Sequence, residues 1–255
     1  MHAGRLIFIL SALLISVGGV ADAQIISAPR PSLADQWTFG FSLLGGIPVG
    51  EFRNHENGGG GGEVSVGFQP IRQQPLVLRF SGGGMQYGNL KGYGFQEVCD
   101  DPDNPFNCYT DEVEYNARSH NMWYAQAGPE ITAIAGAWRP FAFAMAGWTG
   151  FYSRANIKPT TPGGEEWSQG LHSSTNFSTA YGVGIRRVWD AGGRAMGIEV
   201  SPRVTRNAKA SYLSEEGMIR NSDGSWTAVP REGAANVLGI YLGFYVGPRS
   251  RWSTR

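Results

Sequence analysis

The sequence predicts an all-β fold, an eight-stranded antiparallel up-and-down transmembrane β-barrel. Three observations predict it: eight segments alternate with a period of two, long and short connections alternate between them, and the composition favours a lipid-facing sheet. The chain has 37 Gly, 8 Trp, 10 Tyr and 13 Phe in 255 residues, and only 16% of its residues are charged. This mixture suits a β-protein that has one face in hydrocarbon.

The clearest segment is 235–247, with the sequence ANVLGIYLGFYVG. Every second residue from Leu238 to Val246 is bulky and apolar, and the other parity alternates glycine with tyrosine after Val237. A period of two belongs to a strand, because successive side chains of a strand point to opposite faces. We expect this strand to close the barrel by pairing with the first strand.

Seven further segments alternate in the same way, and two of them contain an irregularity. Pro129 lies inside one segment and predicts a β-bulge there. Trp148 falls on the parity opposite to Phe143 and Met145, which we place on the outer face, and so predicts a second bulge. The seven segments are residues 37–47, 63–69, 76–87, 119–134, 141–152, 176–189 and 195–207.

The connections run long, short, long, short, long, short, long. Short periplasmic turns and longer external loops are typical of outer-membrane barrels. The first long connection contains residues 57–62, NGGGGG, which predict a flexible loop tip. Residues 88–118 and 153–175 are predicted to be long polar loops.

The bulky face is predicted to point outward into lipid. An eight-stranded barrel has room inside only for its own side chains, and the polar face here is mostly Gly, Ala, Ser and Thr. A water-facing exterior carries many lysines, but the only lysines lie in the long connections. A secreted lipocalin-like ligand-binding barrel is the alternative. Four tryptophans near strand ends fit interfacial aromatic belts: Trp37, Trp123, Trp138 and Trp189.

Residues 1–23 have the pattern of a secretory signal peptide. Arg5 precedes an apolar stretch, and Ala21-Asp22-Ala23 predicts cleavage between Ala23 and Gln24. The apolar stretch is shorter than the ~20 residues of a spanning helix, which is the alternative interpretation. We therefore expect a signal peptide at 1–23, a short periplasmic segment at 24–36, the barrel at 37–247 and a short tail at 248–255.

The charge balance argues against a nucleic-acid partner. The chain has 21 Lys and Arg against 21 Asp and Glu, and removing Arg5 and Asp22 with the signal peptide keeps the numbers equal. Binding to nucleic acid requires a basic surface. Neither the composition nor the motifs indicate a cofactor.

The segment WTFGFSLLGGIPVGEF, residues 37–52, resembles the opening of the OmpA-type eight-stranded outer-membrane barrel proteins. The closing segment resembles the strand that the barrel-assembly machinery recognises, with Gly239, Leu242 and Phe244 in the signal positions. The resemblance implies a location in the bacterial outer membrane, among its lipid and lipopolysaccharide. Such proteins usually end on an aromatic residue, whereas this chain continues through PRSRWSTR, and we expect no peptidoglycan-binding domain after the barrel.

Six charged residues fall on the inward parity. Equal numbers of buried opposite charges should pair, because an unpaired ion away from water costs several kcal/mol. We expect a salt-bridged plug that fixes the strand register, and a narrow gated pore is the alternative. The six residues are Arg79, Arg186, Arg203, Glu63, Glu130 and Glu199.

The loop at 88–118 holds both cysteines. After export, Cys99 and Cys108 are predicted to form a local disulfide. Asp100, Asp101 and Asp103 supply oxygens for calcium, but this stretch lacks the glycine and terminal glutamate of an EF-hand loop. We interpret it as a solvated acidic loop, with divalent-cation bridging to lipopolysaccharide phosphates as the alternative.

His172 and Ser174 have the His-x-Ser spacing that resembles the lipid A 3-O-deacylases. A histidine in reach of a serine can activate it as a nucleophile. No acidic residue follows on the same strand, so we do not expect an enzyme. The expected function is structural or surface-interactive: envelope integrity, adhesion or binding of an extracellular partner through the external loops. A lipid A-modifying hydrolase is a further alternative.

Overall fold

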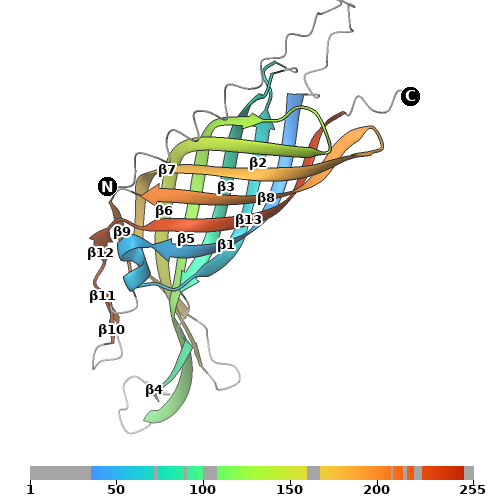
Figure 1. The fold of residues 1–255 in the computed structure, drawn as a ribbon. Coiled ribbons are helices and arrows are strands. Elements are labelled where there is room, and N and C mark those ends of the chain that lie inside the picture. The colour runs from blue at the N-terminus through green and yellow to red at the C-terminus, as the bar shows by residue number, and fades with distance from the viewer. Residues whose placement is uncertain are drawn as a thin grey trace, which may run out of the picture. The chain divides into compact units, whose positions relative to one another are not determined.

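The computed structural model describes residues 36–71, 74–88, 91–99, 108–159, 167–207, 209–214, 217–220 and 226–249. Eight long strands form a closed antiparallel barrel, which confirms the predicted fold class (Figure 1). Within the described residues, no helix is long and apolar enough to cross a membrane. The barrel strands are β1 (Trp37–Val49), β2 (Gly59–Phe68), β3 (Leu76–Gly88), β5 (Cys108–Thr132), β6 (Trp138–Pro159), β7 (Trp167–Ala191), β8 (Arg194–Asn207) and β13 (Asn236–Arg249).

The barrel closes through two pairings. β1 pairs with β13, with Leu43 opposite Leu242, as the sequence predicted. β3 pairs with β5, with Phe80 opposite Ala127, so the chain passes once around the barrel. The short connections 69–75, 133–137 and 192–193 lie at one end, which we call the turn end. We call the opposite end, where the long connections lie, the loop end.

The outer face of the barrel is apolar and exposed. The inward positions carry small, polar or charged side chains over most of the wall, because side chains alternate along each strand. This matches the predicted inner and outer faces of seven strands. The large exposed apolar side chains of the wall are Trp37, Phe39, Phe41, Leu43, Ile47, Val64, Leu76, Leu78, Phe80, Trp123, Ile131, Trp138, Trp148, Phe177, Tyr181, Val183, Ile185, Trp189, Ile198, Val200, Leu238, Ile240, Leu242 and Phe244.

The predicted faces of β6 are wrong. Phe143 and Met145 are buried in the lumen, whereas Trp148 is 60% exposed on the outer face. The register between β6 and β7 is unbroken across Trp148, so no bulge is needed. The alanines at 142, 144 and 146 face outward. Apolar side chains therefore fill the lumen here, and hydrophobicity alone does not distinguish lumen packing from lipid contact.

The bulge predicted at Pro129 is also wrong. Ala127 lies opposite Ala146 and Glu130 lies opposite Phe143, which is one continuous register. The irregularity of β5 lies between Asn116 and Ser119 instead. A proline is accommodated without a shift of pairing.

Glycines 59–62 belong to β2 rather than to a loop tip, so that prediction is wrong. A Cβ on Gly61 would lie 1.9 Å from the Gly84 backbone oxygen of β3. Glycine is used here because the two backbones approach closely. The connection from β1 to β2 holds only a short 3₁₀ helix, η2 (Gly50–Asn54), before β2 begins.

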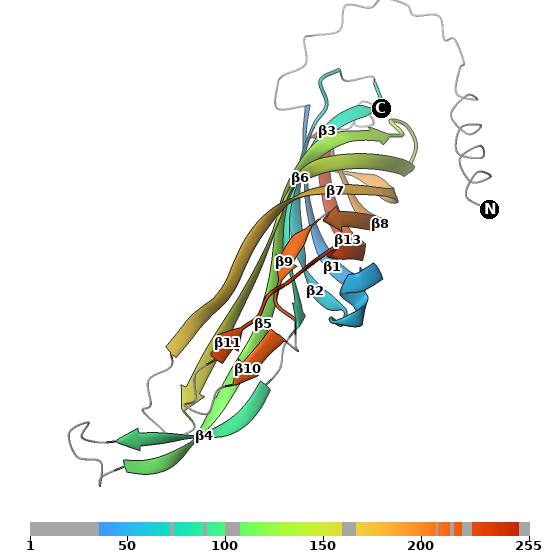
Figure 2. The ribbon, with the colours of Figure 1, turned by 90° about the vertical axis from the view of Figure 1, so that its left-hand side faces the viewer.

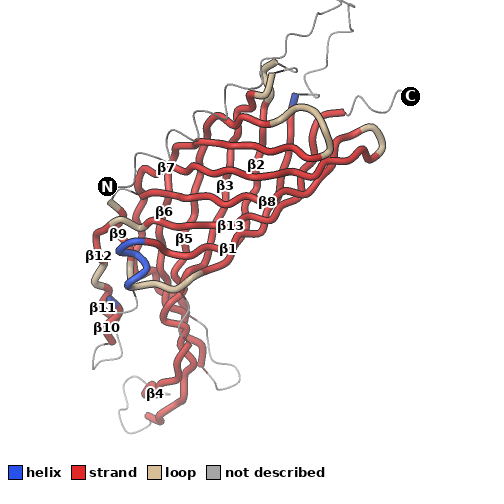
Figure 3. Tube along the Cα trace, in the orientation of Figure 1, coloured by secondary structure: helices blue, strands red, loops and turns tan. Residues whose placement is uncertain are grey.

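Three strands continue past the barrel at the loop end. β5, β6 and β7 have 25, 22 and 25 residues, whereas β1 and β8 have 13 and 14. β4 (Lys91–Cys99) pairs with the start of β5 and adds a fourth strand to this extension (Figures 2 and 3). Much of the two segments predicted as loops, 88–118 and 153–175, is therefore β-strand.

Short strands complete the loop end. β9 (Ala210–Tyr212) pairs with β12 (Arg231–Gly233), and β10 (Met218–Arg220) pairs with β11 (Trp226–Ala228). These strands lie in the last long connection, which the sequence analysis treated as a single loop.

Candidate functional site

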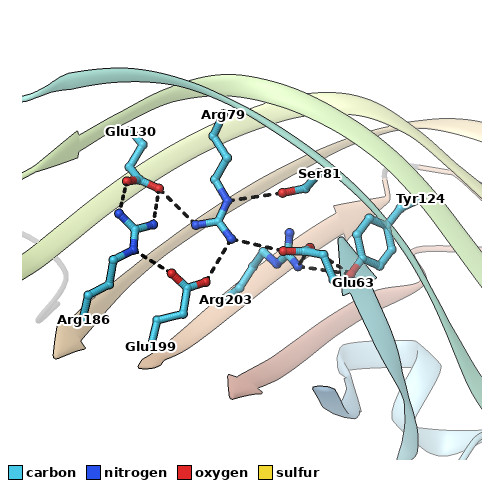
Figure 4. Close-up of polar contacts among 8 residues, drawn as sticks. All are labelled: Glu63, Arg79, Ser81, Tyr124, Glu130, Arg186, Glu199 and Arg203. Carbon is cyan, nitrogen blue, oxygen red and sulfur yellow. Dashed lines mark hydrogen bonds and ion pairs between the residues drawn. The ribbon is translucent and has the colours of Figure 1, made fainter. Parts of the chain in front are cut away.

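The structure brings the six inward charged residues together in the lumen (Figure 4). They come from five strands: β2, β3, β5, β7 and β8. Each side chain is nearly inaccessible to solvent. The six residues, which we call the lumen ion network, are Glu63, Arg79, Glu130, Arg186, Glu199 and Arg203.

Arg79 is the hub of this network. Its Nη1 lies 3.0 Å from Oε2 of Glu130, and its Nη2 lies 3.2 Å from Oε1 of Glu63. The same Nη2 lies 3.3 Å from Oε1 of Glu199. The Nε of Arg79 donates to Oγ of Ser81 at 3.3 Å. One guanidinium therefore connects all three carboxylates.

Arg186 connects two of the carboxylates a second time. Its Nη1 and Nη2 donate to the two oxygens of Glu130 at 2.6 and 2.9 Å, a bidentate pair. Its Nε donates to Oε2 of Glu199 at 2.7 Å. Arg79, Glu130, Arg186 and Glu199 thus form a closed ring of charge-assisted hydrogen bonds, which links β3, β5, β7 and β8.

Arg203 holds the third carboxylate. Its Nη2 donates to Oε2 of Glu63, and the hydroxyl of Tyr124 donates to the same oxygen at 3.0 Å. The Nε and Nη1 of Arg203 have no hydrogen-bond partner among the described residues. The guanidinium carbon lies 3.8 Å from the ring centroid of Tyr241. Stacking on that ring supplies a favourable contact for the buried cation.

Aromatic rings cover the other arginines too. The guanidinium of Arg186 lies 4.0 Å from the ring centroid of Phe141 and 4.9 Å from that of Tyr245. Arg79 lies 5.3 Å from the ring centroid of Phe143. The inward Phe141 and Phe143 on β6 therefore cover the buried guanidinium groups, a role that was not predicted because the sequence pattern placed Phe143 outward.

A second layer closes the lumen at the loop end. Phe52 of η2 is fully buried, and its ring lies 5.2 Å from Tyr87, 6.1 Å from Phe151 and 4.8 Å from Tyr212. We call these four residues the aromatic cap. Tyr212 comes from β9, so two connections of the loop end supply half of the cap. Burial raises the pKa of the Tyr212 hydroxyl above its ordinary value.

A buried histidine and serine, which the sequence pattern did not predict as a pair, lie beside the cap. Nδ1 of His120 is 2.6 Å from Oγ of Ser153, and both side chains are buried. The ring of His120 stacks on that of Tyr87, with centroids 5.7 Å apart. His120 and Ser153 are 1% and 2% exposed, which favours a structural hydrogen bond over nucleophilic chemistry, since that chemistry needs access for a substrate. No sequence pattern indicated this pair, because Ser153 lies in the segment 153–175 that the sequence predicted as a loop.

The predicted His-x-Ser pair does not form a dyad in the structure. Nε2 of His172 donates to the backbone oxygen of Ser211 at 3.1 Å, and Oγ of Ser174 donates to the same oxygen. Both side chains lie on β7 rather than in a loop, and they hold β9 against it. Their shared acceptor gives them a positioning role for the loop end.

Cys99 and Cys108 are directly opposite each other as backbone partners in the β4–β5 hairpin. Their side chains lie outside the described residues, so the disulfide stays a prediction. Asp100, Asp101 and Asp103 also lie outside them. Within the described part of the chain, no group of three or more His, Cys, Asp or Glu side chains is placed to hold a metal ion.

The three residues of the predicted assembly signal lie on β13. Gly239 faces the lumen, whereas Leu242 and Phe244 are 56% and 40% exposed on the outer face. The predicted cleavage site between Ala23 and Gln24 lies outside the described residues.

No family model and no curated protein matches this chain. Solved structures do match in fold. The Neisserial surface protein A, NspA, is 9% identical with a TM-score of 0.43, over 84% of this chain and 97% of its own. Ail, the attachment invasion locus protein of Yersinia pestis, is 11% identical with a TM-score of 0.39, over 83% of this chain and 97% of its own. A second Ail structure, in complex with the heparin analogue sucrose octasulfate, is 10% identical with a TM-score of 0.37, over the same shares.

Proposed function

We propose that this chain is a bacterial outer-membrane β-barrel that acts at the cell surface through the sheet that projects from its loop end. The barrel is lipid-facing in this proposal because its outer wall is apolar and its charges are paired inside. In water, so many contiguous exposed apolar side chains would cause aggregation. We place the turn end in the periplasm and the loop end outside, since external loops are the longer ones.

The observation that carries the surface role is the length of β5, β6 and β7. A tilted membrane strand needs ~9–11 residues, and these strands have 22–25. The excess residues form a sheet with β4 beyond the barrel (Figure 2). A barrel that only spans the membrane has no use for such an extension.

The extension also has an edge for a partner. In the described residues β4 pairs only with β5, so its second edge presents unpaired backbone groups. An extended peptide can add a strand to such an edge. The partners in our proposal are outer-membrane lipid and lipopolysaccharide around the wall, the barrel-assembly machinery at Gly239, Leu242 and Phe244, and an extracellular protein at the extension.

The membrane part of the proposal is tested by heat-modifiability. The protein refolded in detergent micelles should run as a compact band on an SDS gel when unboiled and as an extended band when boiled. A protein that stays soluble without detergent and shows no mobility shift would support the secreted lipocalin-like alternative instead.

The surface role is tested by removing the projecting hairpin. Lys91 and Asn116 are backbone partners, so residues 92–115 can be replaced by a two-residue Asn-Gly turn that keeps the register. Bacteria producing this variant should adhere several-fold less to cultured cells than bacteria producing the full-length protein. Equal compact bands in the two outer-membrane fractions control for assembly. Unchanged adhesion would contradict the proposal.

A narrow gated pore is the second candidate function. A cavity of about 10 Å³, the size of one water molecule, touches Arg79, Glu130, Arg186 and Glu199. If the ion pairs form a gate, Glu130→Ala should raise the conductance of single barrels in planar bilayers. Unchanged conductance in Glu130→Ala and in Arg186→Ala would argue against a pore.

A lipid A-modifying hydrolase is less favoured, because the side chains of His172 and Ser174 both donate to the backbone oxygen of Ser211 rather than to each other.

A further inference from the structure

A cavity of about 290 Å³ lies at the turn end of the barrel, among residues of β6, β7 and β8. This volume is near the lower limit of ligand pockets, which are ~300–1,000 Å³, so the cavity suits one small polar group. Val188 and Ala195 are buried and pack with Tyr245, so they form an apolar floor towards the lumen. The lining side chains are Ala137, Arg139, Val188, Trp189, Asp190 and Ala195.

The barrel wall has a notch beside this cavity. The pairing of β7 with β6 ends at Arg187, and one further backbone hydrogen bond of 2.7 Å joins Val188 to Ala137. The pairing of β7 with β8 continues to Ala191, and Figure 1 shows the β7–β8 hairpin extending past the β5–β6 turn. Among the described strands, none pairs with residues 189–191 on the β6 side, and we call this gap in the wall the notch.

Trp189 connects the cavity with the outer wall. It lines the cavity, and it is 42% exposed on the outer face. Trp138 of β6 is exposed on the same face at the same end. Tryptophan side chains favour the level of the lipid headgroups in a membrane. A lipid that lies against these two rings has its headgroup at the level of the notch.

Arg139 and Asp190 supply the two charges of the cavity. Nε of Arg139 donates to the Gly136 oxygen at 3.2 Å, and Oδ1 of Asp190 accepts from the backbone N–H of Gly193 at 3.0 Å. Within the described part of the chain, Arg139 and Asp190 do not pair with each other, and the Nη groups and Oδ2 make no hydrogen bond. A ligand that carries an anion and a cation can therefore satisfy both side chains.

We propose that this cavity holds the phosphoethanolamine headgroup of a phospholipid from the periplasmic leaflet. The phosphate accepts hydrogen bonds from the Nη groups of Arg139, and the ammonium donates to Asp190. The glycerol leaves through the notch, and the acyl chains lie along the apolar outer wall beside Trp189.

The carboxylate of Asp190 decides which headgroup fits. An anionic phospholipid also has a phosphate for Arg139, but it leaves Asp190 without a cation. A headgroup with a primary amine gives both charges a partner. This inference names a lipid partner of the barrel, and it rests on the proposed outer-membrane location.

The test is native mass spectrometry of the full-length protein refolded in detergent with equal amounts of phosphatidylethanolamine and phosphatidylglycerol. The wild type should retain several-fold more phosphatidylethanolamine. Arg139→Gln should lower the retained amount roughly tenfold, because hydrogen bonds to a charged group are lost. Asp190→Asn should remove the preference for phosphatidylethanolamine and keep the binding of phosphatidylglycerol.

The matched control is Arg187→Gln. Arg187 points to the outer face at the same end, and its guanidinium lies 5.0 Å from the ring centroid of Trp138. This variant should retain as much phosphatidylethanolamine as the wild type. Equal losses in Arg139→Gln and Arg187→Gln, or no preference in the wild type, would overturn the proposal. The compact band of the unheated protein shows separately that the barrel has formed, so a failure of the membrane proposal is recognised first.

A soluble ligand with the same headgroup is the other possible source. In our proposal the acyl chains contribute to binding, so an equal concentration of glycerophosphoethanolamine should leave the lipid in place. Displacement of the lipid under these conditions would assign the cavity to a free solute and overturn the lipid proposal.

Discussion

Arg79 contacts all three carboxylates of the lumen ion network, which neither Arg186 nor Arg203 does in the described hydrogen bonds. Arg79→Ala leaves three buried carboxylates with two cations. We expect the free energy of unfolding to fall by about 3–5 kcal/mol, the cost of breaking a buried ion pair by removing one partner. The measurement is the urea concentration at which the compact gel band of the refolded protein disappears.

Two further variants test whether the loss of stability comes from the charge imbalance in the lumen or would follow from removing any arginine. Arg187→Ala removes an exposed arginine from the outer face and should change the free energy of unfolding by no more than about 0.5 kcal/mol. Adding Glu199→Gln to Arg79→Ala restores equal numbers of charges and should recover part of the loss. If the single and double variants unfold at the same urea concentration, charge imbalance is not the cause.

Phe52 holds the connection between β1 and β2 down on the lumen. Its ring packs on Tyr87, Phe151 and Tyr212, and deleting a buried phenylalanine ring costs about 3–5 kcal/mol. In Phe52→Ala we expect local opening of η2 rather than loss of the barrel. Trypsin should then cleave after the exposed Arg53 many times faster, as followed by mass spectrometry.

The control for the cap is Phe39→Ala, since Phe39 is 56% exposed on the outer face. It removes the same ring from a position that no connection covers. Its cleavage rate after Arg53 should equal that of the wild type. Equal rates in Phe52→Ala and Phe39→Ala would contradict the anchoring role of Phe52.

At the scale of elements, the glycine run of β2 sets how closely β2 approaches β3. A Cβ on Gly61 would lie 1.9 Å from the Gly84 oxygen, whereas a Cβ on Gly62 would meet nothing closer than 3.5 Å. Gly61→Ala should therefore destabilise the barrel by about 1–3 kcal/mol through overpacking. Gly62→Ala should be close to neutral. Urea midpoints in detergent check both, and equal midpoints would refute the close-approach argument.

The β4–β5 hairpin should carry a disulfide at its open end. Directly opposed antiparallel residues have Cα atoms ~4.5–5.5 Å apart, within the ~4.4–6.8 Å range of disulfides. Cys99 and Cys108 are such a pair, so the bond should close the hairpin and add about 2–3 kcal/mol to its local stability. Exported protein should bind no maleimide before reduction and two after it. Labelling without reduction would contradict the bond.

The sequence predicted strands best where one face of the sheet is bulky, apolar and exposed. Alternation identified β13 and the outer faces of six other barrel strands, because a bulky apolar face and a small polar face contrast strongly there. It failed on β6, where Phe141 and Phe143 cover buried arginines and small alanines face outward. It also failed on the extension, where β-strands run through much of the polar segments 88–118 and 153–175 that the sequence predicted as loops.

At the scale of the whole molecule, the alternation of side chains placed the six residues of the lumen ion network on the inward face. It did not show which of them pair with one another. Glu130 and Arg79 are 51 residues apart, and Glu63 and Arg203 are 140 apart. Only the closed barrel brings such positions together. The aromatic cap was not predicted, because Phe52 and Tyr212 come from connections, and the pattern of a connection does not show that it folds back over the lumen.

If the barrel lies in a membrane, as we propose, the cost of a charge on the outer wall should depend on its depth. Leu43 lies at the middle of β1 and Ile47 lies near its loop end, and they are 60% and 55% exposed on the same face. In lipid, Leu43→Arg should cost ~2–4 kcal/mol and Ile47→Arg only ~0–1, because the midplane is the least polar level. In a water-soluble barrel the two substitutions should be equally harmless, since both side chains are equally exposed. Refolding yield and urea midpoint in phospholipid vesicles decide between the two cases. A larger loss for Leu43→Arg supports the membrane location, and equal small effects would contradict it.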